Sequence, residues 1–314
     1  MSKKPAKIDL AALVTGARSL RPNTRRGYLA TVKRWIEFAG DDPEGWTPAK
    51  AQEFYEVLLS DNLSVQSANN MVTGGLAYVS ARINALYGLP NFAAAIDKAK
   101  VGDIEPRHAL IASQARNLLV AAGGGTGDLL AQRDYAACFL GLFTGMRAVS
   151  LVDINLERVV EGPEAVLLNV IVKGGRRADI PIAPWVWARL ADYRKALGRD
   201  TGPLLPRVTQ VSIKTDVRAA TGSMTTNGLY KALKRVADRV PLPTFYPHIF
   251  RHTFATWCRQ AKIEDYLIEV VTAHKSNQGL VARVYTDTTA LHAEVASRCA
   301  DAIEAKIFPK DGAS

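Results

Sequence analysis

The sequence predicts a mainly helical protein with one small antiparallel β-sheet, an α+β class, divided into two domains. Apolar residues recur at helical spacing through most of the 314 residues. One stretch, 158–182, is instead rich in β-branched residues and interrupted by turn sequences. A segment of breaker residues, 101–106, separates a first helical part from the rest. We therefore expect a helical domain over 1–100, a linker over 101–107 and a second domain over 108–314.

The first hundred residues are predicted to form a small helical bundle. Within 24–39, Tyr28, Val32 and Trp35 fall on one face of a helix. Similar apolar periods, with Pro, Ser or Asn near their starts, predict further helices over 48–60, 64–87 and 91–99.

The second domain begins with two predicted helices, 108–122 and 128–143, joined by the glycine-rich turn 123–127. That glycine run lacks the Gly-Lys-Ser/Thr ending of a phosphate-binding loop and follows no strand, so we interpret it as a turn. The stretch 158–182 then predicts a three-stranded antiparallel meander, with a Lys-Gly-Gly turn at 173–175.

Beyond the meander the helical pattern returns and continues to the end of the chain. It is interrupted near 201–224 and 240–247. The last helix, 289–308, carries an apolar stripe formed by Leu291, Val295, Cys299, Ala302, Ile303 and Ile307. The three cysteines are far apart and form no CxxC pair, so we expect all of them to be reduced core residues: Cys138, Cys258 and Cys299.

The formal net charge of +10 is unevenly distributed. Residues 1–34 hold nine Lys and Arg against one Asp, residues 35–106 hold four against ten acidic residues, and residues 107–314 hold 27 against 19. Two basic regions suit a partner with a phosphate backbone, although a solvated basic surface is the alternative. The sequence has no apolar run near the roughly 18 residues of a membrane span and no signal peptide, so we expect a cytoplasmic protein without a membrane partner.

Four local patterns carry chemistry, and they stand in a specific order. An Arg follows a glycine turn at 144–151 (TGMRAVSL), and Lys173 lies at the turn between two predicted strands. The sequence HIFR opens a helix at 248–251, and His274 is followed by Tyr285. Each pattern alone is common in structural roles, whereas four separated patterns in their expected contexts form a specific signal.

Together these patterns resemble the catalytic domain of the tyrosine recombinases, whose signature is Arg, Lys, His-x-x-Arg, His or Trp, and Tyr. The resemblance covers 107–290, and the helical segment around Thr24, Arg25 and Tyr28 resembles the core-binding domain of that family. It implies a C-shaped clamp of two domains around double-stranded DNA. It also implies the catalytic residues Arg147, Lys173, His248, Arg251, His274 and Tyr285.

The residues themselves suit the same reaction. Two guanidinium groups, on Arg147 and Arg251, can offset the charge that grows on a phosphate during metal-free cleavage. Tyr285 supplies a nucleophilic oxygen that would keep the bond energy as a phosphotyrosine. We therefore expect no metal, ATP, other cofactor or small-molecule substrate.

The resemblance assigns the remaining roles. Lys173 is the expected proton donor to the leaving 5′-oxygen, His248 the proton acceptor or hydrogen-bond partner at the scissile phosphate, and His274 a group that orients this phosphate. Contacts with the DNA backbone are expected from Arg25, Arg26, Arg176 and Arg177.

Local alternatives concern His248, His252 and Tyr266. His248 and His252 are four residues apart and could share a metal ion, but Ile249 stands where an HExxH zinc site has Glu. We interpret His252 as a helix-packing residue. Tyr266 lies in an apolar-periodic run, so core packing is its expected role.

Two departures from the family pattern concern the catalytic residues. Ser150 stands three residues after Arg147, where the family usually has an acidic residue, which predicts a different orientation of the site and lower activity. The interval from His274 to Tyr285 is eleven residues rather than the usual nine, which predicts a longer loop before the tyrosine helix.

The leading functional hypothesis is a site-specific recombinase that exchanges strands of two duplexes through a four-way junction. A type IB topoisomerase and a non-catalytic DNA-binding regulator are the alternatives; the charged N-terminal domain and the C-terminal extension favour a recombinase, and the full set of catalytic residues argues against a mere regulator. In the family, a terminal helix such as 289–308 docks on a neighbouring protomer, which implies a homo-tetramer on two duplexes.

Overall fold

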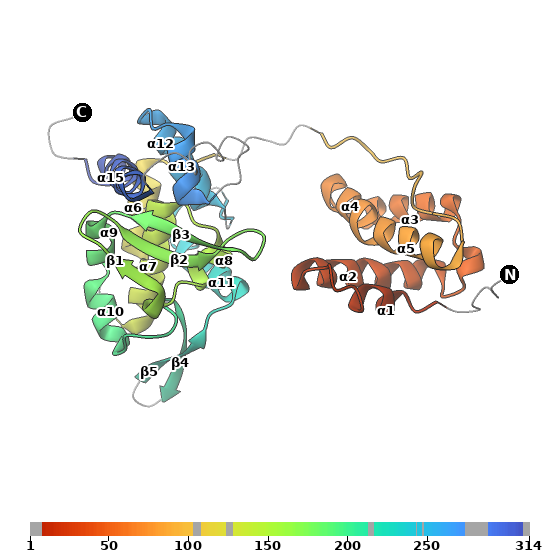
Figure 1. Ribbon diagram of the computed structural model, residues 1–314, viewed down its shortest axis with the longest axis horizontal. Coiled ribbons are helices and arrows are strands. Elements are labelled where there is room, and N and C mark those ends of the chain that lie inside the picture. The colour runs from red at the N-terminus through yellow and green to blue at the C-terminus, as the bar shows by residue number, and fades with distance from the viewer. Residues whose placement is uncertain are drawn as a thin grey trace. The chain divides into compact units, whose positions relative to one another are not determined.

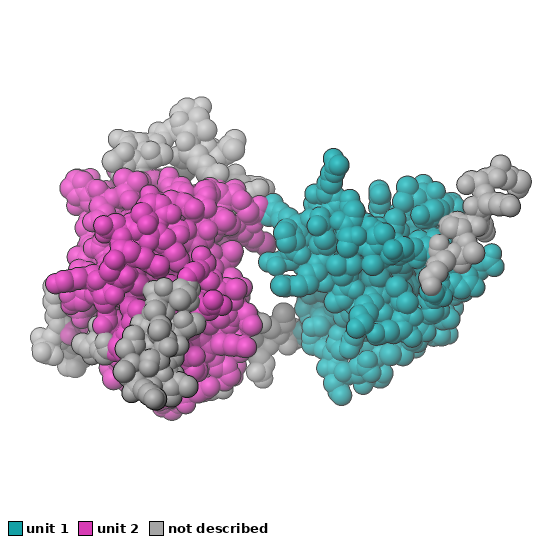
Figure 2. Space-filling view, turned by 90° about the horizontal axis from the view of Figure 1, so that it is seen from below, with its two compact units in different colours: residues 1–105 teal, residues 106–314 magenta. Residues whose placement is uncertain are grey.

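The chain forms two compact units, residues 1–105 and 106–314 (Figure 2). The computed structural model describes residues 8–102, 108–123, 128–212, 217–242, 244–246, 248–273 and 288–309, with backbone alone at 209–221 and 288–289. The predicted class is confirmed, because the described residues are mostly helical and include a small antiparallel sheet.

Unit 1 consists of short helices packed around one aromatic core. Its elements are α1 (Leu10–Thr15), α2 (Pro22–Ala39), the 3₁₀ turn η1 (Pro43–Gly45), α3 (Pro48–Ser60), α4 (Val65–Met71), the π-helical turn η2 (Val72–Leu76) and α5 (Ala77–Tyr87).

Trp35 of α2 is the centre of this core and is fully buried. Its ring stacks on Phe92, with centroids 5.1 Å apart, and meets Phe54 of α3 edge-on at 5.4 Å. The π-helical turn approaches α2 so closely that a Cβ added at Gly75 would stand 2.7 Å from Cβ of Thr31. Glycine is therefore required where these two helices cross.

The helix predicted over 91–99 is wrong. Residues 91–100 form turns and irregular backbone, although Phe92 and Ile96 are buried as the apolar period requires. Side chains of the neighbouring helices satisfy this backbone in place of helical bonds: Ser80 Oγ accepts from Ala93 N at 3.1 Å, and Gln52 Oε1 accepts from Asp97 N at 2.8 Å. The apolar period therefore marks residues that are buried in the core, but these residues do not form a helix.

Unit 2 contains the sheet and the remaining helices. Its elements are α6 (Ala112–Ala121), α7 (Leu129–Thr144), α8 (Ala148–Val152), η3 (Leu156–Arg158), β1 (Val159–Glu161), β2 (Val166–Ile171), β3 (Arg177–Ile182), α9 (Pro184–Ala188), α10 (Ala191–Leu197), β4 (Pro206–Ser212), β5 (Val217–Ser223), α11 (Thr226–Ala237), α12 (Ile249–Gln260), α13 (Asp265–Thr272) and α15 (Thr288–Ile307).

The central helix of unit 2 is α7. Every residue from Arg133 to Thr144 is buried, and α6, α10, α11, α12 and α15 all pack around it (Figure 1). The three cysteines lie in this core and are free thiols, as predicted. Among them, Cys258 of α12 and Cys299 of α15 are hydrogen-bonded to each other, and this bond and burial raise the pKa of the Cys258 thiol.

The predicted meander is confirmed as a three-stranded sheet in the order β1-β2-β3, with both pairs antiparallel. Its second hairpin carries the turn that contains Lys173. A further hairpin, β4–β5, was not predicted and lies where the sequence showed only an interruption of the helical pattern. Figure 1 shows it extending from the end of unit 2 that lies opposite α15.

The terminal helix α15 packs within its own chain. Val295, Ile303 and Ile307 are completely buried, and the helix contacts β3, α12, α13, α7 and α6. The sequence predicted that this helix docks on a neighbouring protomer. The structure instead places its apolar stripe in the core of unit 2. A buried stripe stabilises the chain that contains it.

We expect Ile303→Ala to destabilise unit 2 by about 2–5 kcal/mol, because the removed methylene and methyl groups leave a cavity among fully packed neighbours. Urea unfolding followed by circular dichroism would measure the loss. The matched control is Lys306→Ala on the exposed face of the same helix, expected to change stability by at most about 0.5 kcal/mol. An Ile303→Ala protein as stable as the control would mean that α15 leaves this position in solution.

None of the helices in the described ranges is both long and apolar enough to cross a membrane.

Candidate active site

The first arginine is positioned by a sharp turn at the end of α7. Gly145 ends this helix in the left-handed region, with φ 57°, and a Cβ there would stand 2.8 Å from Cδ1 of Phe254. The Oγ1 of Thr144 accepts from the backbone N–H of Met146 at 3.2 Å. Arg147 follows in an extended conformation as the first flanking residue of α8. Only glycine meets both demands at the turn.

The second arginine reaches the same place because α12 packs closely on α7. A Cβ at Gly141 of α7 would stand 2.6 Å from the ring of Phe250, so the missing side chain makes room for this ring. Phe250 and Phe254 are both buried on the face of α12 that contacts α7. Arg251 is thereby held beside the turn, and its guanidinium donates to the Gly145 carbonyl at 3.2 Å.

Arg147 and Arg251 converge on one acceptor although they lie 104 residues apart in the chain. Nη1 of Arg251 donates to the carbonyl oxygen of Thr272 at 2.7 Å, and Nη1 of Arg147 donates to the same oxygen at 3.4 Å. Both side chains are half-buried, and neither pairs with a carboxylate of the described residues. Among the residues that the structure describes, no carboxylate compensates the charge of these two guanidinium groups.

This arrangement lowers the pKa of both groups. Burial, and next the charge of Arg147, lowers the pKa of Arg251 to about 10, and burial lowers the pKa of Arg147. Both groups stay protonated at neutral pH. The lowered pKa means that folding disfavours the charged form of Arg251, which costs stability. This cost is fully present below about pH 10 and is relieved as the pH rises from there toward the pKa of the unfolded chain. A bound oxyanion would relieve it at neutral pH.

We therefore expect inorganic phosphate to raise the thermal unfolding temperature of the protein through this site. Binding to the folded state at a tenfold excess over the dissociation constant contributes about 1.4 kcal/mol. Differential scanning fluorimetry would compare Arg251→Ala with Arg259→Ala, which removes an exposed arginine of the same helix that is paired with Asp265. The phosphate effect should shrink in Arg251→Ala alone. An equal effect in both variants would contradict an anion site at the arginines.

Lys173 lies in the turn between β2 and β3 and is exposed. The next two residues, Gly174 and Gly175, have φ values of 102° and 72°, a conformation that glycine adopts readily. The turn is closed by Val172 N donating to the Arg176 carbonyl at 2.9 Å. A long cationic side chain thus stands at the tip of a short, defined turn.

The base of this turn is bound to α8. Ser150 Oγ donates to the carbonyl of Ile171 at 2.8 Å, and Asp153 Oδ2 accepts from the N–H of Ile171 at 2.8 Å. The Arg177 guanidinium also donates to Asp153 Oδ2, at 3.2 Å. Ser150, which stands at the usual acidic position, is therefore buried and bonded to the hairpin.

His248 is the residue that precedes α12, one helical turn before Arg251. It is exposed, and its carbonyl accepts from His252 N at 3.0 Å. His252 is exposed as well, so the packing role predicted for it is wrong. Tyr266 is 44% exposed, which also overturns its predicted core position, because α13 buries a different face. The predicted residues His274 and Tyr285 lie outside the described residues.

The four arginines predicted to contact DNA differ in their surroundings. Arg25 donates to the carbonyls of Ala17 and Leu20, at 2.9 and 3.3 Å, and so ties the connection between α1 and α2, whereas Arg26 is exposed. Arg176 is half-buried and Arg177 is bound to Asp153. The Arg26 guanidinium donates only to the neighbouring Asn23 Oδ1, at 3.3 Å, among the hydrogen bonds of the described residues.

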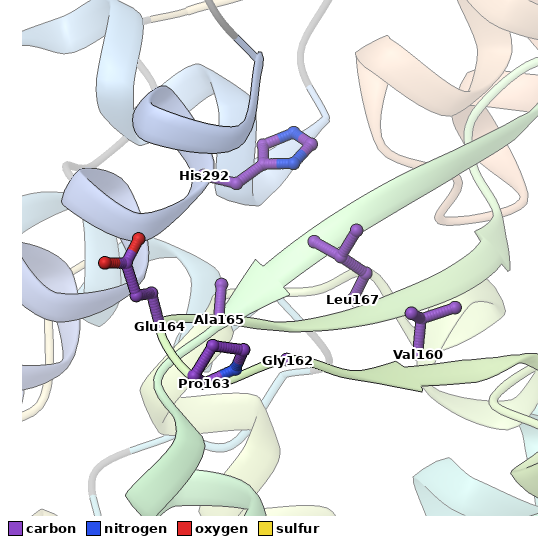
Figure 3. Close-up of a pocket in the computed structure, with 7 residues that line it drawn as sticks. All are labelled: Val160, Gly162, Pro163, Glu164, Ala165, Leu167 and His292. Carbon is purple, nitrogen blue, oxygen red and sulfur yellow. The ribbon is translucent and has the colours of Figure 1, made fainter.

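A pocket lies at the opposite end of the sheet from Lys173. It is lined by Val160, Gly162, Pro163, Glu164, Ala165, Leu167 and His292 (Figure 3). Since β2 spans six residues at about 3.3 Å each, the β1–β2 turn and the β2–β3 turn stand about 20 Å apart. Figure 3 shows His292 projecting from α15 over this largely apolar surface. The pocket is separate from the arginine site.

Two parts of the site are not among the residues predicted from the sequence. The Thr272 carbonyl that joins the arginines is a backbone group, and no residue type signals it. Asp153 did have a signal, because it lies three residues after Ser150 and so faces the same way from α8.

Similar solved structures share this fold. A lambda integrase fragment, a dimer bound to a COC′ core site, has a TM-score of 0.64 and 18% identity, covering 85% of this chain and 94% of that chain. A lambda integrase tetramer bound to a Holliday junction has a TM-score of 0.62 and 18% identity, covering 88% of this chain and 77% of that chain. XerH site-specific recombinase bound to difH substrate has a TM-score of 0.62 and 17% identity, covering 88% of this chain and 81% of that chain. No curated protein matches the sequence.

The family model described as "Phage integrase family" matches residues 109–292, which is more than half of the chain. The matched region contains Arg147, Lys173, the HIFR sequence, His274 and Tyr285, in the order that the tyrosine recombinase signature requires. The chain therefore belongs to the phage integrase family of tyrosine recombinases.

Proposed function

We propose that this recombinase cuts and rejoins DNA strands at a specific site through a phosphotyrosine on Tyr285, without metal or ATP. The observation that carries the proposal is the convergence of Arg147 and Arg251 on one carbonyl, in a half-buried site without a carboxylate partner among the described residues. Structural arginines usually find such a partner. Two that share a site without one are suited to an anion with several oxygens, such as a phosphodiester.

The proposed reaction conserves the bond energy of the phosphodiester. The phenolic oxygen of Tyr285 attacks phosphorus and loses its proton to His248, while the bond from phosphorus to the 5′-oxygen breaks. Lys173 gives a proton to the leaving oxygen, and the two arginines stabilise the charge on the non-bridging oxygens. His274 orients the same phosphate. A 5′-hydroxyl of a second strand then reverses these steps and releases Tyr285.

The DNA partner is proposed to lie between an N-terminal core-binding unit and the catalytic unit, which would close around the duplex as a clamp. The basic segment 1–34 and the exposed Arg26 support a role of unit 1 in contacting the phosphate backbone. Four copies on two duplexes would perform a complete exchange through a four-way junction. Similar proteins have been solved as a dimer and as a tetramer on DNA, which supports this assembly.

The test uses labelled duplex fragments that tile the DNA flanking the protein's own gene. The protein is incubated with each fragment in EDTA without nucleotide, and the products are separated on a denaturing gel. We expect a protein-linked strand and a partner strand that carries a free 5′-hydroxyl. Adding an excess of a second duplex with a 5′-hydroxyl end should transfer the linked strand to it.

Failure to form any linked strand across the flanking DNA would contradict the proposed function. A linked strand that forms only with added Mg²⁺ would contradict the metal-free reaction. Relaxation of supercoiled plasmid without strand transfer between duplexes would favour a topoisomerase in place of a recombinase.

A further inference from the structure

The last residue of β2 needs backbone partners that the sheet does not provide. β1 pairs with β2 only over 166–168, so β2 extends three residues beyond its neighbour. On the other side, Ile171 stands opposite Arg177 of β3. In a strand, the N–H and C=O of one residue point to the same side, and those of Ile171 point toward α8. Without partners there, two half-buried polar groups would be unsatisfied.

Ser150 and Asp153 supply both partners. The Ser150 hydroxyl donates to the Ile171 carbonyl and the Asp153 carboxylate accepts from the Ile171 N–H, each at 2.8 Å. Asp153 also accepts from the Arg177 guanidinium at 3.2 Å, and Arg177 is the residue paired with Ile171. One carboxylate therefore holds both strands at the last pair before the turn.

This contact joins two parts of the active site. Arg147 directly precedes α8, and Lys173 lies two residues beyond Ile171. Because α8 has only five residues, the distance from the arginine to the base of the hairpin is bridged by one short rigid element. The Asp153 carboxylate, at the end of α8, fixes the orientation of the β2–β3 hairpin relative to this helix.

We propose that Asp153 is a positioning residue that holds the Lys173 turn in register with the Arg147 site, so that Lys173 can reach the leaving 5′-oxygen. The inference rests on the proposed function. It makes Asp153 a residue that acts through Lys173 and does not itself touch DNA. Ser150 forms the second contact of the same anchor.

The test measures cleavage of two duplexes built on the position mapped by the flanking-DNA experiment. One has the ordinary 5′-oxygen at the scissile phosphate, and the other has sulfur in its place, which leaves without a proton. Asp153→Ala should slow cleavage of the ordinary duplex on the order of 10²-fold, because a displacement of about 1 Å has that effect, and leave the sulfur duplex nearly unaffected. Asp153→Asn keeps an acceptor for Ile171 and should recover most of the rate.

The matched control is Asp179→Ala, which removes an exposed carboxylate two residues further along β3. Asp179 Oδ1 accepts from Asn169 Nδ2 at 2.7 Å and does not contact the last pair of the hairpin. Both duplexes should be cleaved at the normal rate by this variant. Equal slowing of both duplexes in Asp153→Ala, as general destabilisation would produce, would overturn the inference.

A second measurement is independent of cleavage. Hydrogen exchange followed by mass spectrometry should show faster deuterium uptake across 170–177 in Asp153→Ala than in Asp179→Ala, with uptake in unit 1 unchanged. Unchanged uptake across 170–177 would overturn the anchor itself. If the wild-type protein links to no DNA while this uptake still rises, the proposed function fails and the anchor stands.

Discussion

Tyr285→Phe is expected to abolish covalent attachment of the protein to DNA while folding and DNA affinity persist. The substitution removes one oxygen, and that oxygen is the proposed nucleophile, so the chemical step should slow by at least about 10⁴-fold. The measurement uses a labelled duplex with a nick just beyond the scissile phosphate, which traps the linked product, followed by a denaturing gel. Filter binding on an intact duplex would show that affinity is retained.

The control for this prediction is Tyr266→Phe. Tyr266 is the other tyrosine that follows the HIFR sequence, and it is 44% exposed on α13. This variant should form the linked product at a nearly normal rate. A linked band that persists in Tyr285→Phe, or disappears only in Tyr266→Phe, would contradict the assignment of the nucleophile.

Where local signals agreed, the elements could be predicted from sequence. The helix expected over 48–60 has those bounds in the structure, because Pro48 fits its first position and the Thr47 hydroxyl caps it by accepting from Lys50 N. The meander was also predictable, since its β-branched runs and glycine turns act over short distances. Such elements depend on neighbours in the chain, which the sequence displays directly.

Elements that depend on distant contacts could not be predicted in this way. The periodic segment 91–99 forms no helix because Ser80 and Gln52, from other helices, satisfy its backbone. The stripe of α15 correctly indicated a buried face, but a period does not say which surface covers it, and the surface is the chain's own core. The same reasoning applies to Tyr266, which shares a run with buried residues and yet lies on the outer face of α13.

The candidate site also combines a part with a local sequence signal and a part that depends on distant contacts. The Arg147 turn carries a local signal, because Gly145 must adopt a left-handed conformation. Its approach to Arg251 was predicted only through the family resemblance, since a spacing of 104 residues contains no geometric information. The physical reason for the approach is the absence of a side chain at Gly141, which leaves room for the Phe250 ring between the helices.

Lys173→Ala is the second change with a large expected effect. A proton donor placed at a leaving oxygen contributes about 10²- to 10⁴-fold to the rate, so cleavage of the ordinary duplex should fall by that factor. Cleavage of the duplex with sulfur at the leaving position should stay near the wild-type rate, because a thiolate leaves without a proton. Single-turnover rates of appearance of the linked strand would measure both.

The control for Lys173→Ala comes from the same turn. Arg176 lies three residues further and is proposed only to contact the backbone, so Arg176→Ala should weaken binding and slow both duplexes by one common factor. The ratio of the two rates therefore separates a proton donor from a phosphate contact, whatever the loss of affinity. If Lys173→Ala slowed both duplexes equally, Lys173 would be a phosphate contact, and the leaving oxygen would have to receive its proton from another group.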